Sequence, residues 1–147
     1  MSESPQHAGK TAVVTGGSGG IGFAVCQRLA IEGACVFSAD LSPTKKSLPE
    51  NSHYFKLDIT REDSAEALME TVLAKAGRLD ILVNAAGIEI EKTIEETSLE
   101  DWNRIFAVNV TGIFLTSKHA LPLMRVAGGG SIINFGSYDG FIADPGL

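Results

Sequence analysis

The feature of this sequence that most restricts its fold is a regular alternation of short apolar runs with stretches of helical periodicity. The apolar runs cover residues 12–14, 34–39, 53–57, 79–83 and 131–135, and as a group they lack a polar face. Strands that are buried on both faces occur in parallel sheets covered by helices, and the connections between them are right-handed crossovers. The sequence therefore predicts an α/β fold: a doubly wound parallel sheet in a three-layer α/β/α arrangement.

The first two helices are predicted from apolar spacing and from their end signals. Apolar residues between positions 21 and 29 recur at helical spacing, and Gly33 closes that helix. Thr60, with Asp63 three residues later, has the pattern of an N-terminal capping box for the second helix. Its apolar face runs over residues 65–76.

A third, longer helix is predicted after residue 97. Ser98 and Asp101 form a second capping box at its start. Trp102 lies at helical spacing with later apolar residues, which predicts a core position for its ring. Pro122 is expected to kink or end the helix, and Gly128–Gly130 to end it.

Composition excludes several classes of partner. Twelve basic against eighteen acidic residues give a net charge of −6, and no basic cluster exceeds Lys45-Lys46. With this charge we expect neither a groove that binds nucleic acid nor a surface that binds anionic membranes. No apolar run is long enough for a transmembrane helix, and the polar tail of residues 1–9 lacks the apolar run of a signal peptide.

The cysteines and histidines predict neither disulfides nor a metal site. Cys26 and Cys35 are expected to be small buried hydrophobes in a reduced compartment, so the predicted localisation is cytoplasmic. The histidines have no metal-ligand spacing with them; they are His7, His53 and His119.

A glycine-rich turn, Gly16–Gly22, lies between the first strand and the first helix. It fits G-x-G-x-x-G from Gly17 and G-x-x-x-G-x-G from Gly16. Glycines at these positions allow the backbone to approach a pyrophosphate, whose charge meets the amides of the helix N-terminus. The alternative is a tight strand-to-helix connection without a ligand.

An acidic residue, Asp40, follows the second strand eighteen residues beyond Gly22. A carboxylate there can accept hydrogen bonds from the ribose hydroxyls of adenosine and would repel a 2′-phosphate. Neither the glycine turn nor Leu41-Ser42 contains a lysine or arginine, so NAD is favoured over NADP. The alternatives are a solvated loop carboxylate or an Asx-turn.

A residue suited to ligand binding follows each of the five predicted strands: Gly16, Asp40, Asp58, Asn84 and Ser137. The carboxyl ends of parallel strands meet at one edge, where open α/β sheets bind ligands. These residues are therefore expected at one site.

Asn109 lies on the inward stripe of the long helix. A buried amide must be hydrogen-bonded, because leaving it unpaired costs a few kcal/mol. Asn109 would either satisfy neighbouring backbone groups or hold an ordered water near the rim.

Together these motifs resemble the short-chain dehydrogenases/reductases, in their classical branch. The matching segments are Thr15-Gly16-x-x-x-Gly20-Ile21-Gly22, Asp40, Leu57-Asp58-Ile59, Asn84-Ala85-Ala86-Gly87, Asn109, and Gly130-Ser131-Ile132-Ile133-Asn134 leading to Ser137. The resemblance implies that residues 1–147 are the N-terminal part of a Rossmann-like NAD(P)-binding domain, truncated after the fifth strand.

The resemblance also implies site residues. Catalytic roles fall on Ser137, which would hydrogen-bond the substrate oxygen, and on Asn109, which would hold a water of the proton relay. Cofactor-binding roles fall on Gly16, Ser18, Gly20, Ile21, Gly22, Asp40, Leu41, Asp58, Ile59, Asn84, Ala85, Ala86 and Gly87.

One departure from the family pattern bears on function. The family's acid–base pair, Tyr-x-x-x-Lys, is absent, since neither Tyr54 nor Tyr138 has a lysine four residues later, and the sequence stops in Pro145-Gly146-Leu147. Two functions remain open: an NAD-dependent oxidoreductase acting on a small alcohol or carbonyl substrate, or a non-catalytic dinucleotide-binding remnant. The resemblance further implies a dimer or tetramer for the full-length form.

Overall fold

Parallel pairing of all five strands confirms the doubly wound sheet that the apolar runs predict. The computed structural model describes residues 5–141, so the first four residues of the polar tail and the Pro145-Gly146-Leu147 stretch lie outside it. The strands are β1 (Thr11–Thr15), β2 (Cys35–Asp40), β3 (Ser52–Lys56), β4 (Ile81–Asn84) and β5 (Ser131–Asn134). They form one sheet in the order β3-β2-β1-β4-β5.

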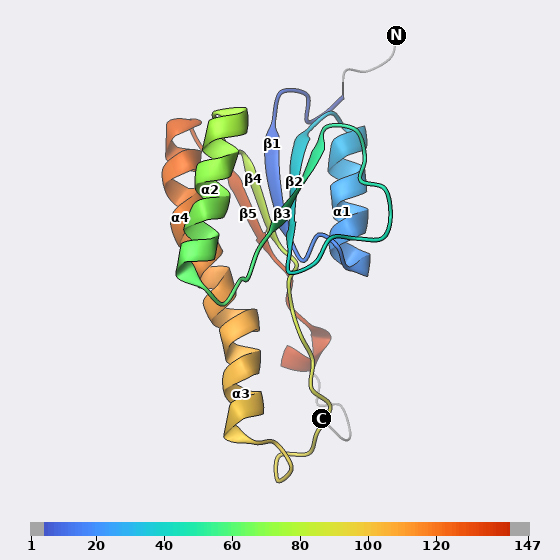
Figure 1. Cartoon of the computed structure of the whole chain (residues 1–147), viewed down its shortest axis with the longest axis vertical. Coiled ribbons are helices and arrows are strands. Elements are labelled where there is room, and N and C mark those ends of the chain that lie inside the picture. The colour runs from blue at the N-terminus through green and yellow to red at the C-terminus, as the bar shows by residue number, and fades with distance from the viewer. Residues whose placement is uncertain (1–4, 142–147) are drawn as a thin grey trace.

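Helices cover both faces of this sheet (Figure 1). They are α1 (Gly20–Ile31), α2 (Glu62–Ala76), α3 (Leu99–Phe106), the π-helical segment η1 (Ala107–Thr111), α4 (Gly112–Val126) and the short 3₁₀ turn η2 (Tyr138–Gly140). α1 lies on one face, and α2 and α4 lie side by side on the other.

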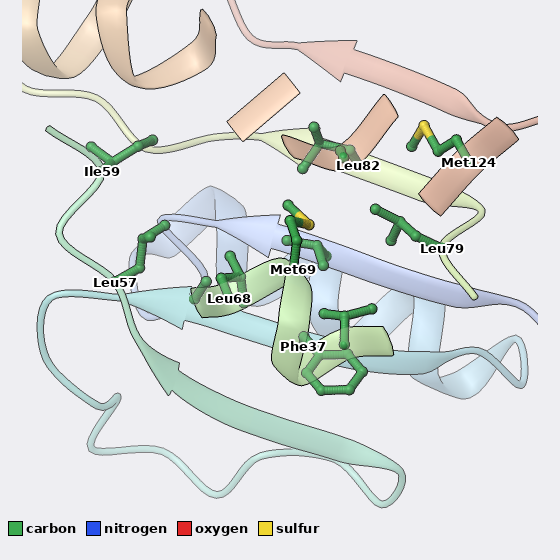
Figure 2. Packing of buried hydrophobic residues seen from close by; sticks show 12 residues of the cluster. Phe37, Leu57, Ile59, Leu68, Met69, Leu79, Leu82 and Met124 are labelled. Carbon is green, nitrogen blue, oxygen red and sulfur yellow. The ribbon is translucent and has the colours of Figure 1, made fainter. Parts of the chain in front are cut away.

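Two hydrophobic cores result, because successive residues of a strand point to opposite faces. In β1, Val13 joins the core under α2 and α4, whereas Ala12 and Val14 join the core under α1. The first core is the larger, and Figure 2 shows Phe37, Leu68 and Leu82 packed in it. Because each face of β1 lies in one of these cores, the strand has no polar face.

The last described strand, β5, is covered on one face only. Ile132 packs against the core under α4, whereas Ile133 and Phe135 are exposed. On this side of the sheet, α1 packs on β1 and β2. Within residues 5–141, β5 is therefore an edge strand with a bare apolar face.

The prediction that Thr60 caps α2 is wrong. Arg61 occupies the N-cap position, and its side chain, which pairs with the Asp63 carboxylate, makes no capping hydrogen bond to the helix backbone. Thr60 instead donates its amide and its hydroxyl to Asp58 Oδ1, at 3.1 and 2.6 Å. The Asp58 carboxylate, two residues after β3, therefore binds the donors of Thr60 in place of the helix start.

Pro122 does not end its helix, contrary to one of the two predicted outcomes. α4 runs through Pro122 to Val126, and the helix ends where Gly128 and Gly129 take positive φ values. Pro122 is exposed, so water can hydrate the carbonyl that loses its partner, while buried Ala120 and Met124 hold the helix to the sheet.

The predicted core position of Trp102 is also wrong. The capping box between Ser98 and Asp101 forms as predicted. However, α3 extends beyond the carboxyl edge of the sheet (Figure 1), so no strand within residues 5–141 lies against it. Trp102 is 49% exposed and stacks on Phe106 with ring centroids 4.7 Å apart.

The two cysteines are unpaired, but they differ in burial. Cys26 is fully buried under the sheet, and this burial raises the pKa of its thiol to about 11. Cys35 is only half-buried, so the expectation of a buried side chain holds for Cys26 alone. Among residues 5–141 there is no helix with the length and apolarity needed to cross a bilayer.

A buried carboxylate, Asp80, ties the starts of β1 and β4 together. It accepts hydrogen bonds from the Thr11 amide at 3.0 Å, from Lys10 Nζ at 3.1 Å, and from Arg78 Nη2 at 2.6 Å. Burial alone would raise the pKa of Asp80. The hydrogen bonds from Arg78, Thr11 and Lys10, with the charge of Arg78, outweigh burial and lower the pKa to about 2.

Because this pKa lies below the ordinary value of 3.8, the ionised form stabilises the folded state above about pH 4. We expect this contribution, about 2 kcal/mol, to be lost as the pH falls from about 4 to about 2. Urea unfolding of wild type and Asp80→Asn between pH 2 and 7 measures it, with the exposed α2 variant Glu70→Gln alongside. Equal pH dependence in wild type and Asp80→Asn would contradict the assignment.

Candidate functional site

A cleft of about 450 Å³ opens at the carboxyl edge of the sheet. Its walls are the segments that follow β1, β2, β3 and β4, together with one face of α3 and η1. The lining residues are Gly16, Gly19, Ala39, Asp40, Leu41, Leu57, Asp58, Ile59, Thr60, Ala85, Ala86, Gly87, Ile88, Arg104 and Val108. The cleft thus spans the point between β1 and β4 where the order of strands reverses, as expected for an open α/β sheet.

The glycine turn is pressed against its neighbours. Gly16 has a φ of +67°, and a Cβ there would lie 2.7 Å from both Cα and N of Ala86. A Cβ on Gly22 would lie 2.2 Å from the Gly16 carbonyl oxygen. Glycine is therefore required at both positions by contact with backbone, which does not relax easily.

The N-terminus of α1 opens from this turn without an acidic partner. Gly19 is the N-cap, no side chain caps the helix, and the first turn contains no carboxylate. Amides at a helix N-terminus carry a partial positive charge and attract anions. This end of the cleft is chemically suited to a phosphate group.

Asp40 joins the end of β2 to the glycine turn. Its Oδ2 accepts a hydrogen bond from the Ser18 amide at 3.0 Å, and Ser18 Oγ donates to the Ser42 carbonyl at 2.7 Å. This long-range contact differs from both sequence alternatives, a solvated loop carboxylate and an Asx-turn. Among the described residues Asp40 Oδ1 has no hydrogen-bond partner, so it can accept one from a ligand.

The segment after β3 contributes two apolar side chains to the floor of the cleft. Leu57 and Ile59 are buried, and Asp58 between them is half-buried. A Cβ on Gly112 would lie 2.7 Å from Ile59 Cγ1, so the long helix approaches this floor closely. That approach brings Val108 and Arg104 to the cleft.

Asn84, at the end of β4, is fully buried in a network of side chains. Its Nδ2 donates to Asn134 Oδ1 at 2.9 Å, and its Oδ1 accepts from Thr116 Oγ1 at 2.8 Å. The network joins β4, β5 and α4 directly behind the cleft. Asn84 therefore braces the site from below and does not line it.

Asn109, in η1, bonds to the backbone. Its Oδ1 accepts from the Ile88 amide and its Nδ2 donates to the Ile88 carbonyl, both at 2.9 Å. Of the two sequence alternatives, this is the first, satisfaction of neighbouring backbone groups. Ser137 is exposed just after β5 and, like Asn109, is not part of the cleft lining.

Of the thirteen predicted cofactor-binding residues, eight line the cleft and five do not. Residues that line the cleft are Gly16, Asp40, Leu41, Asp58, Ile59, Ala85, Ala86 and Gly87. Residues outside the lining are Ser18, Gly20, Ile21, Gly22 and Asn84. Within residues 5–141 there is no cluster of His, Cys, Asp and Glu suited to a metal ion.

The lining residues that were not among the predicted site residues are Gly19, Ala39, Leu57, Thr60, Ile88, Arg104 and Val108. Arg104 and Val108 lie eight and four residues before Gly112, respectively, so the three residues share one helical face. The i, i+4 spacing of Arg104 and Val108 could have indicated that this helical face lines the site.

Comparison with known proteins agrees with this geometry. The family model for short chain dehydrogenases matches residues 10–147. The chain is 38% identical over 145 residues to a cyclopentanol dehydrogenase of Comamonas sp., covering 93% of this chain and 58% of that protein. It is 34% identical to the 3-oxoacyl-[acyl-carrier-protein] reductase of Thermotoga maritima, covering 94% of this chain and 59% of the reductase.

A solved structure agrees as well. The aldohexose dehydrogenase of Thermoplasma acidophilum in its ligand-free form superposes with a TM-score of 0.90 at 31% identity, covering 97% of this chain and 55% of that one. The chain thus spans somewhat more than half the length of the relatives it matches. The motif order, the sheet topology and the family match together establish that this chain belongs to the short chain dehydrogenase family.

Proposed function

We propose that this chain binds NAD in the cleft and forms the dinucleotide-binding part of an oxidoreductase acting on a small alcohol or carbonyl compound. The observation that carries the proposal is the joint placement of an uncapped helix N-terminus, a glycine turn without room for side chains, and the Asp40 carboxylate in one cleft. These three features suit pyrophosphate, close backbone approach and ribose hydroxyls, respectively.

In this proposal, different residues bind different parts of the cofactor. The turn from Gly16 to Gly22 would hold the pyrophosphate, and Asp40 would accept the ribose hydroxyls while Leu41 covers that sugar. Ala85–Gly87 would wall the middle of the cleft, braced by Asn84. When bound, the nicotinamide supplies the group that donates or accepts hydride.

The catalytic part of the proposal concerns Ser137 and Asn109. Ser137 would hydrogen-bond the substrate oxygen from the end of β5. Asn109 holds the Ile88 backbone beside Gly87, and with it the segment after β4, so its proposed role in a proton relay depends on a water bound at this amide. A tyrosine with a lysine four residues later, the usual partner of such groups by resemblance, does not occur in the 147 residues.

Two measurements test these statements separately. Calorimetric titration with NAD and NADH tests cofactor binding, and absence of heat from a folded sample would overturn the proposal. Absorbance of NADH with a panel of secondary alcohols then separates the oxidoreductase from a non-catalytic binding protein. Turnover by this chain alone would exclude the second function.

The substrate panel can start from two relatives. A cyclopentanol dehydrogenase and a cis-4-hydroxycyclohexanecarboxylate dehydrogenase are each 38% identical to this chain. Both names describe a hydroxyl group on a carbon ring. We therefore propose cyclic secondary alcohols, and the corresponding ketones, as the first compounds to assay.

Asp40 sets the proposed preference for NAD over NADP. We expect Asp40→Ala to lower the ratio of NAD to NADP affinity by about tenfold or more, because a charged hydrogen-bond acceptor is lost and repulsion of the 2′-phosphate disappears. Titration of wild type and variant with both cofactors measures the ratio. Asp63→Ala on the exposed start of α2 is the matched control, and an unchanged ratio in Asp40→Ala would remove the assignment.

The proposal extends to assembly and compartment. An exposed apolar stripe runs along α3, η1 and α4 through Trp102, Phe106, Val110 and Phe114. Such a stripe supports the proposed dimer or tetramer, which sedimentation of the chain would test. The unpaired cysteines support a reduced, cytoplasmic compartment.

A further inference from the structure

The far end of the cleft suits a flat aromatic base. If the proposed function holds, the glycine turn takes the pyrophosphate and Asp40 the ribose, so the base attached to that ribose must occupy what remains of the cleft. This remainder is lined by the apolar side chains of Leu57 and Ile59 and by Val108, which packs against the same core. The following inference rests on that placement.

Arg104 lies at the rim of this apolar end. It is an exposed residue in the last turn of α3, one helical turn before Val108, and it lines the cleft. It is the only lysine or arginine among the described lining residues.

The side chain of Arg104 has no partner of its own within residues 5–141: no hydrogen bond or ion pair involves its guanidinium. The nearby carboxylate of Asp101 is already engaged by Lys92 at 2.7 Å and by the Ser98 hydroxyl at 2.7 Å. Asp58, on the floor of the cleft, accepts hydrogen bonds from Thr60. An uncommitted cation at the mouth of an apolar cleft is thus left to a ligand.

We propose that Arg104 covers the adenine of the bound nucleotide, with its guanidinium plane against the ring and the apolar floor on the other side. A planar, weakly hydrated guanidinium stacks on aromatic rings better than an ammonium does. Arg104 is then a positioning residue, because it holds the adenosine half and does not touch the reacting atoms. The residue strengthens binding and does not choose between NAD and NADP, which differ at the ribose.

The competing explanation is a general attraction of phosphate by one positive charge. The two explanations differ in what lysine does at this position. A lysine keeps the positive charge but lacks the planar guanidinium group. It should therefore restore attraction of the phosphates but not stacking on the adenine ring.

The test is calorimetric titration of NADH into the chain and its variants. We expect Arg104→Ala to weaken NADH binding roughly three- to thirty-fold, and Arg104→Lys to recover only a minor part of that loss. Arg125→Ala, an exposed arginine near the end of α4 and outside the cleft, is the matched control and should bind as wild type. NADPH should lose affinity by the same factor as NADH in Arg104→Ala.

Several outcomes would overturn the inference. Affinity of Arg104→Ala within twofold of wild type would remove the contact, and full recovery in Arg104→Lys would replace stacking with simple charge attraction. A wild-type chain that does not bind NADH would instead overturn the proposed function, and this inference with it. Circular dichroism of each variant verifies folding, which substitution of this exposed side chain should not alter.

Discussion

Replacing Gly22 by alanine is expected to weaken cofactor binding by roughly a hundredfold and to destabilise the fold by about 3 kcal/mol. The added Cβ would lie 2.2 Å from the Gly16 carbonyl oxygen and 3.1 Å from Gly17 Cα. Both contacts are with backbone, so either α1 or the turn must move. Movement of the turn displaces the amides and the Asp40 contact that the proposed site needs.

Gly20→Ala is the stability control for this variant. Gly20 begins α1 only two residues earlier, and a Cβ there has no heavy atom within 4 Å. We expect Gly20→Ala to unfold at the same urea concentration as wild type or slightly above it, because alanine favours helix. Equal stability of Gly22→Ala and Gly20→Ala would contradict the steric account of the turn.

Replacing Asn84 by alanine is expected to cost about 3 kcal/mol of stability. The amide is fully buried, and its removal breaks the hydrogen bonds to Asn134 and Thr116 and leaves a cavity between β4 and α4. Because the segment after β4 lines the cleft, cofactor affinity should fall as well. Urea unfolding followed by titration measures both effects.

A double-mutant cycle with Thr116→Val isolates the buried hydrogen bond. Thr116 Oγ1 can also donate to the Gly112 carbonyl at 3.0 Å, so the hydroxyl is not stranded when Asn84 is removed. We expect a coupling energy of about 1 kcal/mol between the two positions. Strictly additive losses would show that the two side chains act independently, and the network would then not be a unit.

Several structural features followed from local sequence alone. The apolar runs predicted parallel strands because a strand without a polar face must be covered twice. Gly16 and Gly22 predicted a tight turn, and Ser98 with Asp101 predicted a helix start that forms as expected. These features depend on backbone sterics and on contacts between residues close in the chain.

Other features depend on contacts that local sequence does not contain. Thr60 has the right type and spacing for a cap, yet Asp58, two residues after β3, accepts hydrogen bonds from both of its donors. Trp102 has the spacing of a core residue, yet α3 runs past the sheet and leaves it half-exposed. Propensity and periodicity indicate which secondary structure a segment favours. They do not indicate which residues from distant parts of the chain it will contact.

The candidate site divides in the same way. The sequence by itself determined the residues that follow each strand, and parallel pairing ensures that they share one edge. Only the tertiary structure decided that Asp40 bonds to Ser18, that Asn109 bonds to Ile88, and that Arg104 lies at the cleft. The physical reason is that strand ends are set by the pattern of each strand, whereas these contacts are set by how closely the helices pack on the sheet, as at Gly112 against Ile59.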